Sequence, residues 1–206
     1  MPVQDIPAAP GYEEVQPDVL DRARRYKLFT GAVVPRPIAL VTSIGETGVV
    51  NAAPFSQFVI VAVDPGLLGF SIGPGPRGYK DTLRNVQRER EFVINMVSWS
   101  LAAIVQRCGE DLPPEMSEIE ENELELIRSE RVKAPRVAAS KVQFECVLER
   151  IVEAGDAPNH FVIGKVVLAH IEKGLLSDFK IDTRRYDPLA RIGGRTFARL
   201  GEILSV

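Results

Sequence analysis

The chain has 206 residues, 45% of them apolar, and a formal net charge of −3 at pH 7, which suits one globular domain or one domain with additions. This charge argues against a general nucleic-acid binder, which would carry a basic surface. We find neither a charged-then-apolar leader nor an apolar run long enough to span a bilayer. We therefore expect a soluble cytoplasmic protein that binds no nucleic acid and no membrane.

The two cysteines, Cys108 and Cys146, lie far apart and show neither a disulfide framework nor the spacing of metal ligands. The two histidines also lack metal-ligand partners at a recognisable spacing. We therefore expect no metal site and two buried, inert thiols.

The N-terminal residues have the composition of an addition to the main domain. Residues 1–18 contain four prolines, which favours an arm over a core element. Residues 18–29 are polar and arginine-rich and carry a weak helical stripe of apolar residues. We expect an N-terminal arm and short helix over residues 1–27 and one main domain over residues 28–206.

The main domain shows short apolar segments separated by glycine and proline turns. Strands are predicted over residues 38–44, 49–53, 59–63 and 67–72, with a hairpin turn at residues 45–48. Further strands are predicted over residues 91–97, 142–151 and 161–168, the last two paired with each other. Short helices are predicted over residues 101–108 and from Asp81 or Thr82, as N-cap, to about Arg90. This order predicts a mainly β protein with short helices, built as an antiparallel barrel or sandwich.

Residues 51–58, Asn-Ala-Ala-Pro-Phe-Ser-Gln-Phe, form the first of two candidate ligand-binding stretches. Small residues allow a flat ligand to approach the backbone. Pro54 should break ladder pairing and leave the amides on either side free to face that ligand. A bulge or bend between two strands explains the same residues without a ligand.

Residues 80–85, Lys-Asp-Thr-Leu-Arg-Asn, form the second stretch. Lys80 supplies a cation, Thr82 a hydroxyl, and the start of the helix supplies unpaired amides that favour a phosphate. Asp81 fits best as a cap turned away from that ligand. An ordinary capped helix with an exposed lysine is the alternative. The Gly-x-x-x-x-Gly-Lys loop of nucleotide triphosphatases is absent.

Several motifs occur together and in a fixed order: residues 36–43, 48–56, 64–65, 80–85 and 91–95. In this order they resemble the flavin reductase-like, FMN-binding split-barrel family, which includes flavoredoxins and the reductase components of two-component monooxygenases. The resemblance covers roughly residues 28–171. It implies an FMN-binding split β-barrel that forms a homodimer, with FMN near the subunit interface.

The resemblance also implies roles for individual residues. Thr42 and Ser43 would lie beside the phosphate or the ribityl chain of FMN, and Lys80 and Thr82 would hold the phosphate on a helix that Asn85 helps to fix. The isoalloxazine ring would be lined, largely through backbone groups, by Asn51, Ala53, Phe55 and Ser56. Arg36 and Pro54, from the same motifs, complete the cofactor-binding set that the resemblance implies.

His160 is the one candidate catalytic residue. Many family members carry Gly-Asp-His before an apolar strand that ends in Gly-Glu-Val, whereas this chain has Asn159 and Lys165 at the two acidic positions. The resemblance makes His160 a candidate wall of the flavin or nicotinamide site. A polar histidine at the entrance of a strand is the alternative.

The function that the resemblance implies is NAD(P)H-dependent flavin reduction, in which nicotinamide passes a hydride to flavin. FMN is the expected cofactor, with FAD as the alternative, and NADH or NADPH is the expected donor. Electrons would pass to an oxygenase or another acceptor partner. A non-enzymatic, flavoredoxin-like electron carrier reduced by a protein partner is the alternative function. We assign the acidic residues 110–130 to a solvated loop and helix without a functional role.

Overall fold

The structure is a computed structural model that describes residues 11–75, 78–110 and 118–205. Part of the expected N-terminal arm and part of the acidic segment lie outside these ranges. The chain divides into two compact units, with the boundary between Val34 and Pro35. This boundary lies a few residues later than the one expected at residue 28.

The first unit contains one turn of 3-10 helix, η2 (Pro17–Val19), and the helix α1 (Arg22–Ala32). The carboxylate of Asp21 caps α1 by accepting a hydrogen bond of 2.7 Å from the amide of Arg24. This bond satisfies one of the amides that every helix start leaves unpaired. The helix predicted within residues 18–29 is therefore present and runs three residues further.

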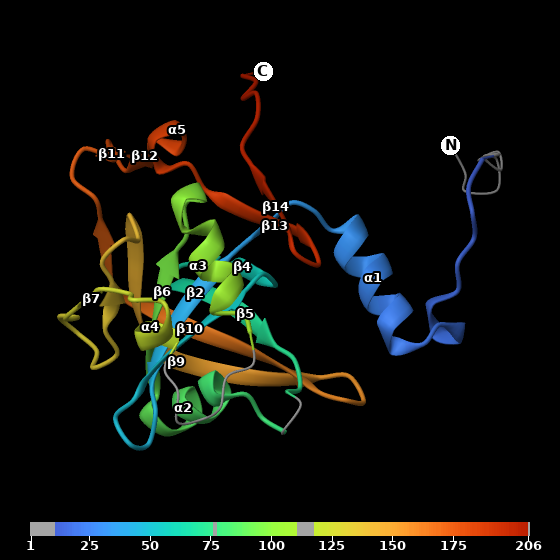
Figure 1. Ribbon diagram of the computed structural model, residues 1–206, viewed down its shortest axis with the longest axis horizontal. Coiled ribbons are helices and arrows are strands. Elements are labelled where there is room, and N and C mark those ends of the chain that lie inside the picture. The colour runs from blue at the N-terminus through green and yellow to red at the C-terminus, as the bar shows by residue number, and fades with distance from the viewer. Residues whose placement is uncertain (1–10, 76–77, 111–117, 206) are drawn as a thin grey trace. The chain divides into compact units, whose positions relative to one another are not determined.

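The second unit is organised around a seven-stranded antiparallel sheet with the strand order β3-β2-β6-β9-β10-β5-β4 (Figure 1). The strands are β2 (Ala39–Ile44), β3 (Val50–Phe55), β4 (Phe58–Val63), β5 (Gly66–Ile72), β6 (Glu91–Met96), β9 (Val142–Ala154) and β10 (Asn159–Ile171). Each corresponds to a predicted strand, and β9 pairs with β10 as predicted. The mainly β class is confirmed.

Two helices of this unit pack against its sheet through two separate apolar clusters. The helix α2 (Asp81–Glu89) inserts Leu83 and Val86 into a cluster with Phe70 and Phe92. The helix α3 (Ala102–Arg107) follows the 3-10 turn η3 (Trp99–Leu101) and packs through a second cluster that includes Leu40, Ala52 and Leu189. Because alternate strand residues point to opposite faces, β2 and β3 contribute to both clusters.

Smaller elements complete the unit. A three-stranded sheet contains β1 (Arg36–Pro37), β13 (Leu189–Gly193) and β14 (Thr196–Arg199). The remaining elements are α4 (Glu118–Glu121), β7 (Leu126–Ile127), β8 (Arg136–Val137), β11 (Leu176–Ser177), β12 (Lys180–Ile181) and α5 (Thr183–Tyr186).

Two local expectations were wrong. Pro54 does not interrupt β3, since it pairs with Leu40 and the strand runs on to Phe55. β3 ends the strand order and is therefore an edge strand, where a missing N–H on the outer side breaks no ladder bond. The N-cap of α2 is Lys80, without a side-chain cap, whereas Asp81 and Thr82 are the first two helical residues.

A buried carboxylate on β9 fixes the loop over residues 129–133. Glu145 is fully buried and accepts hydrogen bonds from the amides of Glu130 (2.9 Å), Arg131 (2.6 Å) and Val132 (3.2 Å), and its Oε1 lies 2.6 Å from Nε2 of His170. Burial by itself would raise the pKa of Glu145, but these donors stabilise the anion and hold the pKa below its usual range. Glu145 thus stabilises this loop as a charged group.

Two kinds of feature are absent from the described ranges. None of the helices there has the length and apolar character needed to cross a membrane. No group of three or more histidine, cysteine or acidic side chains there is arranged to hold a metal ion. Cys108 and Cys146 are both buried and unbridged, as predicted.

Candidate functional site

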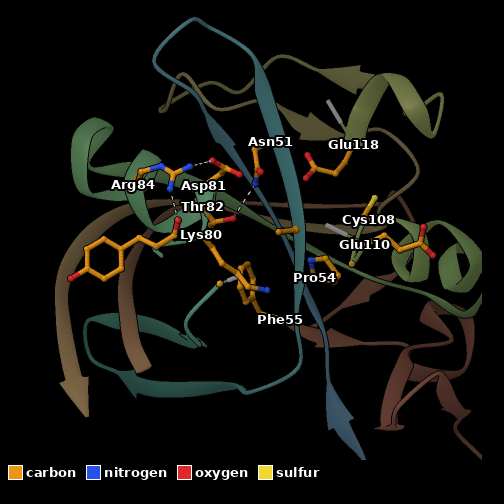
Figure 2. Close-up of a pocket in the computed structure, with 14 residues that line it drawn as sticks. Asn51, Pro54, Phe55, Lys80, Asp81, Thr82, Arg84, Cys108, Glu110 and Glu118 are labelled. Carbon is orange, nitrogen blue, oxygen red and sulfur yellow. Dashed lines mark hydrogen bonds and ion pairs between the residues drawn. The ribbon is translucent and has the colours of Figure 1, made fainter. Parts of the chain in front are cut away.

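A pocket of the second unit lies between the edge strand β3, the start of α2 and the residues around Cys108 and Glu118 (Figure 2). It joins the two stretches that the sequence suggested as ligand sites. Its lining residues are Asn51, Ala53, Pro54, Phe55, Gly75, Tyr79, Lys80, Asp81, Thr82, Arg84, Cys108, Gly109, Glu110 and Glu118.

The start of α2 presents unpaired amide donors to this pocket. The first helical hydrogen bonds run from the amides of Leu83 and Arg84 to the carbonyl of Lys80. Among the residues that the structure describes, none accepts a hydrogen bond from the amides of Asp81 or Thr82. Amides in this position, together with the helix dipole, favour an anionic ligand.

Among the described charged side chains around this helix start, Asp81 is paired with a cation and Lys80 is left to interact with a ligand. Asp81 forms an ion pair with Arg84, which also donates a hydrogen bond to the carbonyl of Tyr79. The negative charge of Asp81 is thereby balanced by its own helix. Lys80 has no ion pair within the described part of the chain, so its ammonium group remains available to a ligand.

Thr82 links the helix to the edge strand. Its Oγ1 accepts a hydrogen bond of 3.0 Å from Nδ2 of Asn51, which Figure 2 shows crossing between the two elements. One layer deeper, Nδ2 of Asn85 donates to Oγ of Ser43 at 3.1 Å, and both of these side chains are buried. Ser43 and Asn85 therefore position α2 against β2, and only the outer pair, Thr82 and Asn51, lines the pocket.

The opposite wall carries a carboxyl group and a thiol. Oε2 of Glu118 lies 3.2 Å from the amide of Ala52, which donates to it, and burial raises the pKa of Glu118. Sγ of Cys108 is 3.6 Å from Nδ2 of Asn122, and burial raises the pKa of this thiol to about 12. Cys108 is therefore a protonated, unreactive group at neutral pH.

Six of the predicted site residues lie outside this lining. Ser43 and Asn85, described above, are two of them, and the others are Thr42, Arg36, Ser56 and His160. Thr42 is on the other face of β2, where its hydroxyl donates to the carbonyl of Pro135 at 2.5 Å. Arg36 is buried and donates to the carbonyl of Ile192 at 3.0 Å. Ser56 follows the last residue of β3. The contacts of Thr42 and Arg36 suit packing, so we leave both out of the ligand-binding set.

His160, the last of these six residues, lies on β10. It is 2% exposed, and its ring packs edge-on against Tyr79 with a centroid distance of 5.0 Å. Its Nε2 is 3.4 Å from a carboxylate oxygen of Glu153. His160 thus touches a lining residue and is not itself part of the lining.

Several lining residues are not among the predicted site residues. Arg84 could have been found from its spacing, because a residue four positions after Lys80 lies on the same side of a helix. Glu118 and Cys108 come from segments whose position depends on the tertiary fold. The acidic segment, which was expected to have no functional role, contributes Glu118 and Glu110 to the pocket.

Comparisons with known proteins identify the family of this chain. Residues 30–190 match the model of the flavin reductase like domain. The chain belongs to the flavin reductase-like family. Nitrilotriacetate monooxygenase component B from Bacillus cereus is 36% identical with a TM-score of 0.92, and the similarity covers 96% of this chain and 100% of that chain. The 2-nitrobenzoate 2-nitroreductase of Pseudomonas fluorescens is 30% identical with a TM-score of 0.86, over 94% of this chain and 95% of that chain.

A further structure identifies the fold. A putative flavin reductase with a split barrel domain from Shewanella frigidimarina superimposes with a TM-score of 0.82 at 20% identity, over 92% of this chain and 94% of that chain. The open seven-stranded antiparallel sheet of this chain is therefore the split barrel that the sequence resemblance implied.

Proposed function

We propose that this chain is an NAD(P)H-dependent flavin reductase that binds FMN in the pocket between β3 and α2. The observation that carries the proposal is the start of α2, where the amides of Asp81 and Thr82 and the cation Lys80 face the same pocket and have no partner among the described residues. An FMN phosphate is a dianion, and charge-assisted hydrogen bonds from amides and an ammonium group are its preferred partners. Membership of the flavin reductase-like family supports the same ligand.

Further residues would hold the rest of the cofactor. Thr82 would donate its hydroxyl hydrogen to the phosphate, because its oxygen already accepts from Asn51. Ala53 and Phe55 share one face of β3 and would form an apolar wall for the ring, as a flat apolar group requires. Bound flavin supplies the redox chemistry by accepting a hydride from nicotinamide. The protein would supply position and electrostatics.

Similar proteins suggest the acceptor. The component B of nitrilotriacetate monooxygenase, to which this chain is 36% identical, belongs by its name to a multicomponent oxygenase. We therefore place an oxygenase component first among the candidate partners. The similarity to a nitroreductase favours a second candidate, in which the reduced flavin acts directly on a small aromatic substrate.

The outer edge of the sheet suggests how the chain assembles. β4 ends the strand order, and its apolar residues Val59, Ile60 and Val63 are 50%, 67% and 87% exposed. A long apolar edge strand in water pairs readily with another chain. A homodimer that covers β4 accounts for these residues.

The proposal is tested by absorption spectroscopy of the purified protein with added FMN, made anaerobic before NADH or NADPH is added. A perturbed flavin spectrum that bleaches within turnover time supports the reductase and identifies the donor. A bound flavin that stays oxidised with both nucleotides and bleaches with dithionite would instead favour the flavoredoxin-like electron carrier. The absence of any flavin binding would refute the proposal.

A further inference from the structure

Glu118 is a carboxyl group held inside the pocket, and no cation among the described residues balances it. It comes from α4 and faces Asn51 across β3, opposite the start of α2 (Figure 2). Its hydrogen bond from the amide of Ala52 fixes the side chain over the edge strand. In the described part of the chain, no lysine, arginine or histidine forms an ion pair with Glu118.

The other charges of the pocket are arranged differently. Asp81 is balanced by Arg84, and Lys80, on the helix side, forms no ion pair with a residue that the structure describes. Glu110 also lines the pocket but is exposed, so water screens its charge. Cys108 also lines the pocket and is neutral because burial raises the pKa of its thiol. Once ionised, Glu118 is therefore the least screened negative charge among the described residues of the wall opposite Lys80. Because burial raises the pKa of Glu118, its effect as an anion is tested at alkaline pH.

A negative charge in this position would act mainly on a ligand that gains negative charge. When nicotinamide passes a hydride to flavin, two electrons and one proton enter the ring and oxidised nicotinamide leaves. Unless the ring takes up a second proton, it then carries one more negative charge than before. A carboxylate beside such a ring repels the reduced form more than the oxidised form.

We propose that Glu118 selectively weakens the binding of reduced flavin and so promotes its release to an acceptor. This inference rests on the proposed function, since it assumes that FMN occupies the pocket. It makes Glu118 a specificity-determining residue for the redox state of the ligand. This preference suits a protein that delivers reduced flavin to a separate oxygenase, and it does not suit one that keeps its flavin through turnover.

The test is the dissociation constant of FMN in both redox states for Glu118→Gln at a pH of about 8. Glutamine keeps the shape of the side chain and an oxygen that can accept from the amide of Ala52. Reduced FMN is prepared anaerobically with dithionite, and binding is followed by fluorescence or calorimetry. The matched control is Glu120→Gln, which removes one charge from an exposed position of the same helix.

We expect Glu118→Gln to lower the ratio of the reduced to the oxidised dissociation constant by roughly fivefold, the effect of one partly screened unit charge. For a two-electron couple this equals a rise of about 20 mV in the midpoint potential of the bound flavin. Glu120→Gln should leave the ratio unchanged.

Three results would overturn the inference. An unchanged ratio in Glu118→Gln would show that this carboxylate does not face the ring. If Glu118→Gln lowered the dissociation constants of reduced and oxidised FMN equally, the carboxylate would lie near the phosphate. If Glu120→Gln changed the ratio as much as Glu118→Gln, the effect would come from the net charge of the protein and not from Glu118. If the unaltered protein bound no FMN, the proposed function itself would fail, and the inference with it.

Discussion

Removing the ammonium group of Lys80 should weaken FMN binding while leaving riboflavin binding unchanged. Lys80→Met keeps most of the aliphatic stem and removes only the charge. Hydrogen bonds to charged groups contribute about 1.5–3 kcal/mol, and the lower part of this range applies because the side chain is exposed. Since about 1.4 kcal/mol corresponds to a factor of ten, we expect the FMN dissociation constant to rise roughly tenfold.

Riboflavin makes this prediction specific, because it carries the same ring and ribityl chain without the phosphate. Both ligands are titrated by flavin fluorescence against the unaltered protein and Lys80→Met. A loss of affinity confined to FMN supports contact between Lys80 and the phosphate. Equal losses for FMN and riboflavin, or no loss for either, would refute the placement of the phosphate at the start of α2. Added salt should shrink the difference, because it screens an exposed charge.

Three further predictions concern stability and assembly. Gly164→Ala should destabilise the fold by about 1–3 kcal/mol in chemical denaturation, because a Cβ there would overlap the ring of Phe92, whereas Gly193→Ala has free space and should cost little. Glu145→Gln should destabilise by about 2 kcal/mol at neutral pH through loss of its charged hydrogen bonds. The pKa of Glu145 is lowered on folding, so this difference should shrink as pH falls below 4.5. Ile60→Lys should convert the proposed dimer to a monomer, as measured by sedimentation velocity, because it places a charge on the exposed edge strand β4.

The strands of the main unit could be predicted because their signals are local. β9 alternates apolar and polar residues, and glycine or proline turns bound the earlier strands, so periodicity and turn chemistry were sufficient. The start of α2 was also predictable to within two residues. Its N-cap was assigned to Asp81 or Thr82 because these residue types favour that position. The structure instead pairs Asp81 with Arg84, a contact inside the first turn that leaves Lys80 as the cap.

The wall of the pocket could not be predicted from local signals. Strand periodicity implies that neighbouring residues point to opposite faces, so Thr42 and Ser43 cannot both face one ligand. The sequence does not say which face will be covered by α2. Glu118 and Cys108 reach the pocket only because α3 and α4 pack against the face of the sheet that carries Ala52. Such contacts are decided by tertiary packing, and no pattern within either segment marks them.

The edge position of β3 explains why the pocket forms where it does. In an antiparallel pair, alternate residues direct their amides away from the partner strand, and here Ala52 does so toward Glu118. Pro54, two residues later on the same edge, has no amide to satisfy. The outer edge of β3 therefore needs only one acceptor over this stretch, and Glu118 provides it. The strand can then present Asn51, Ala53 and Phe55 to a ligand without leaving buried donors unpaired. An edge strand without the proline and the carboxylate would leave these outward amides without an acceptor.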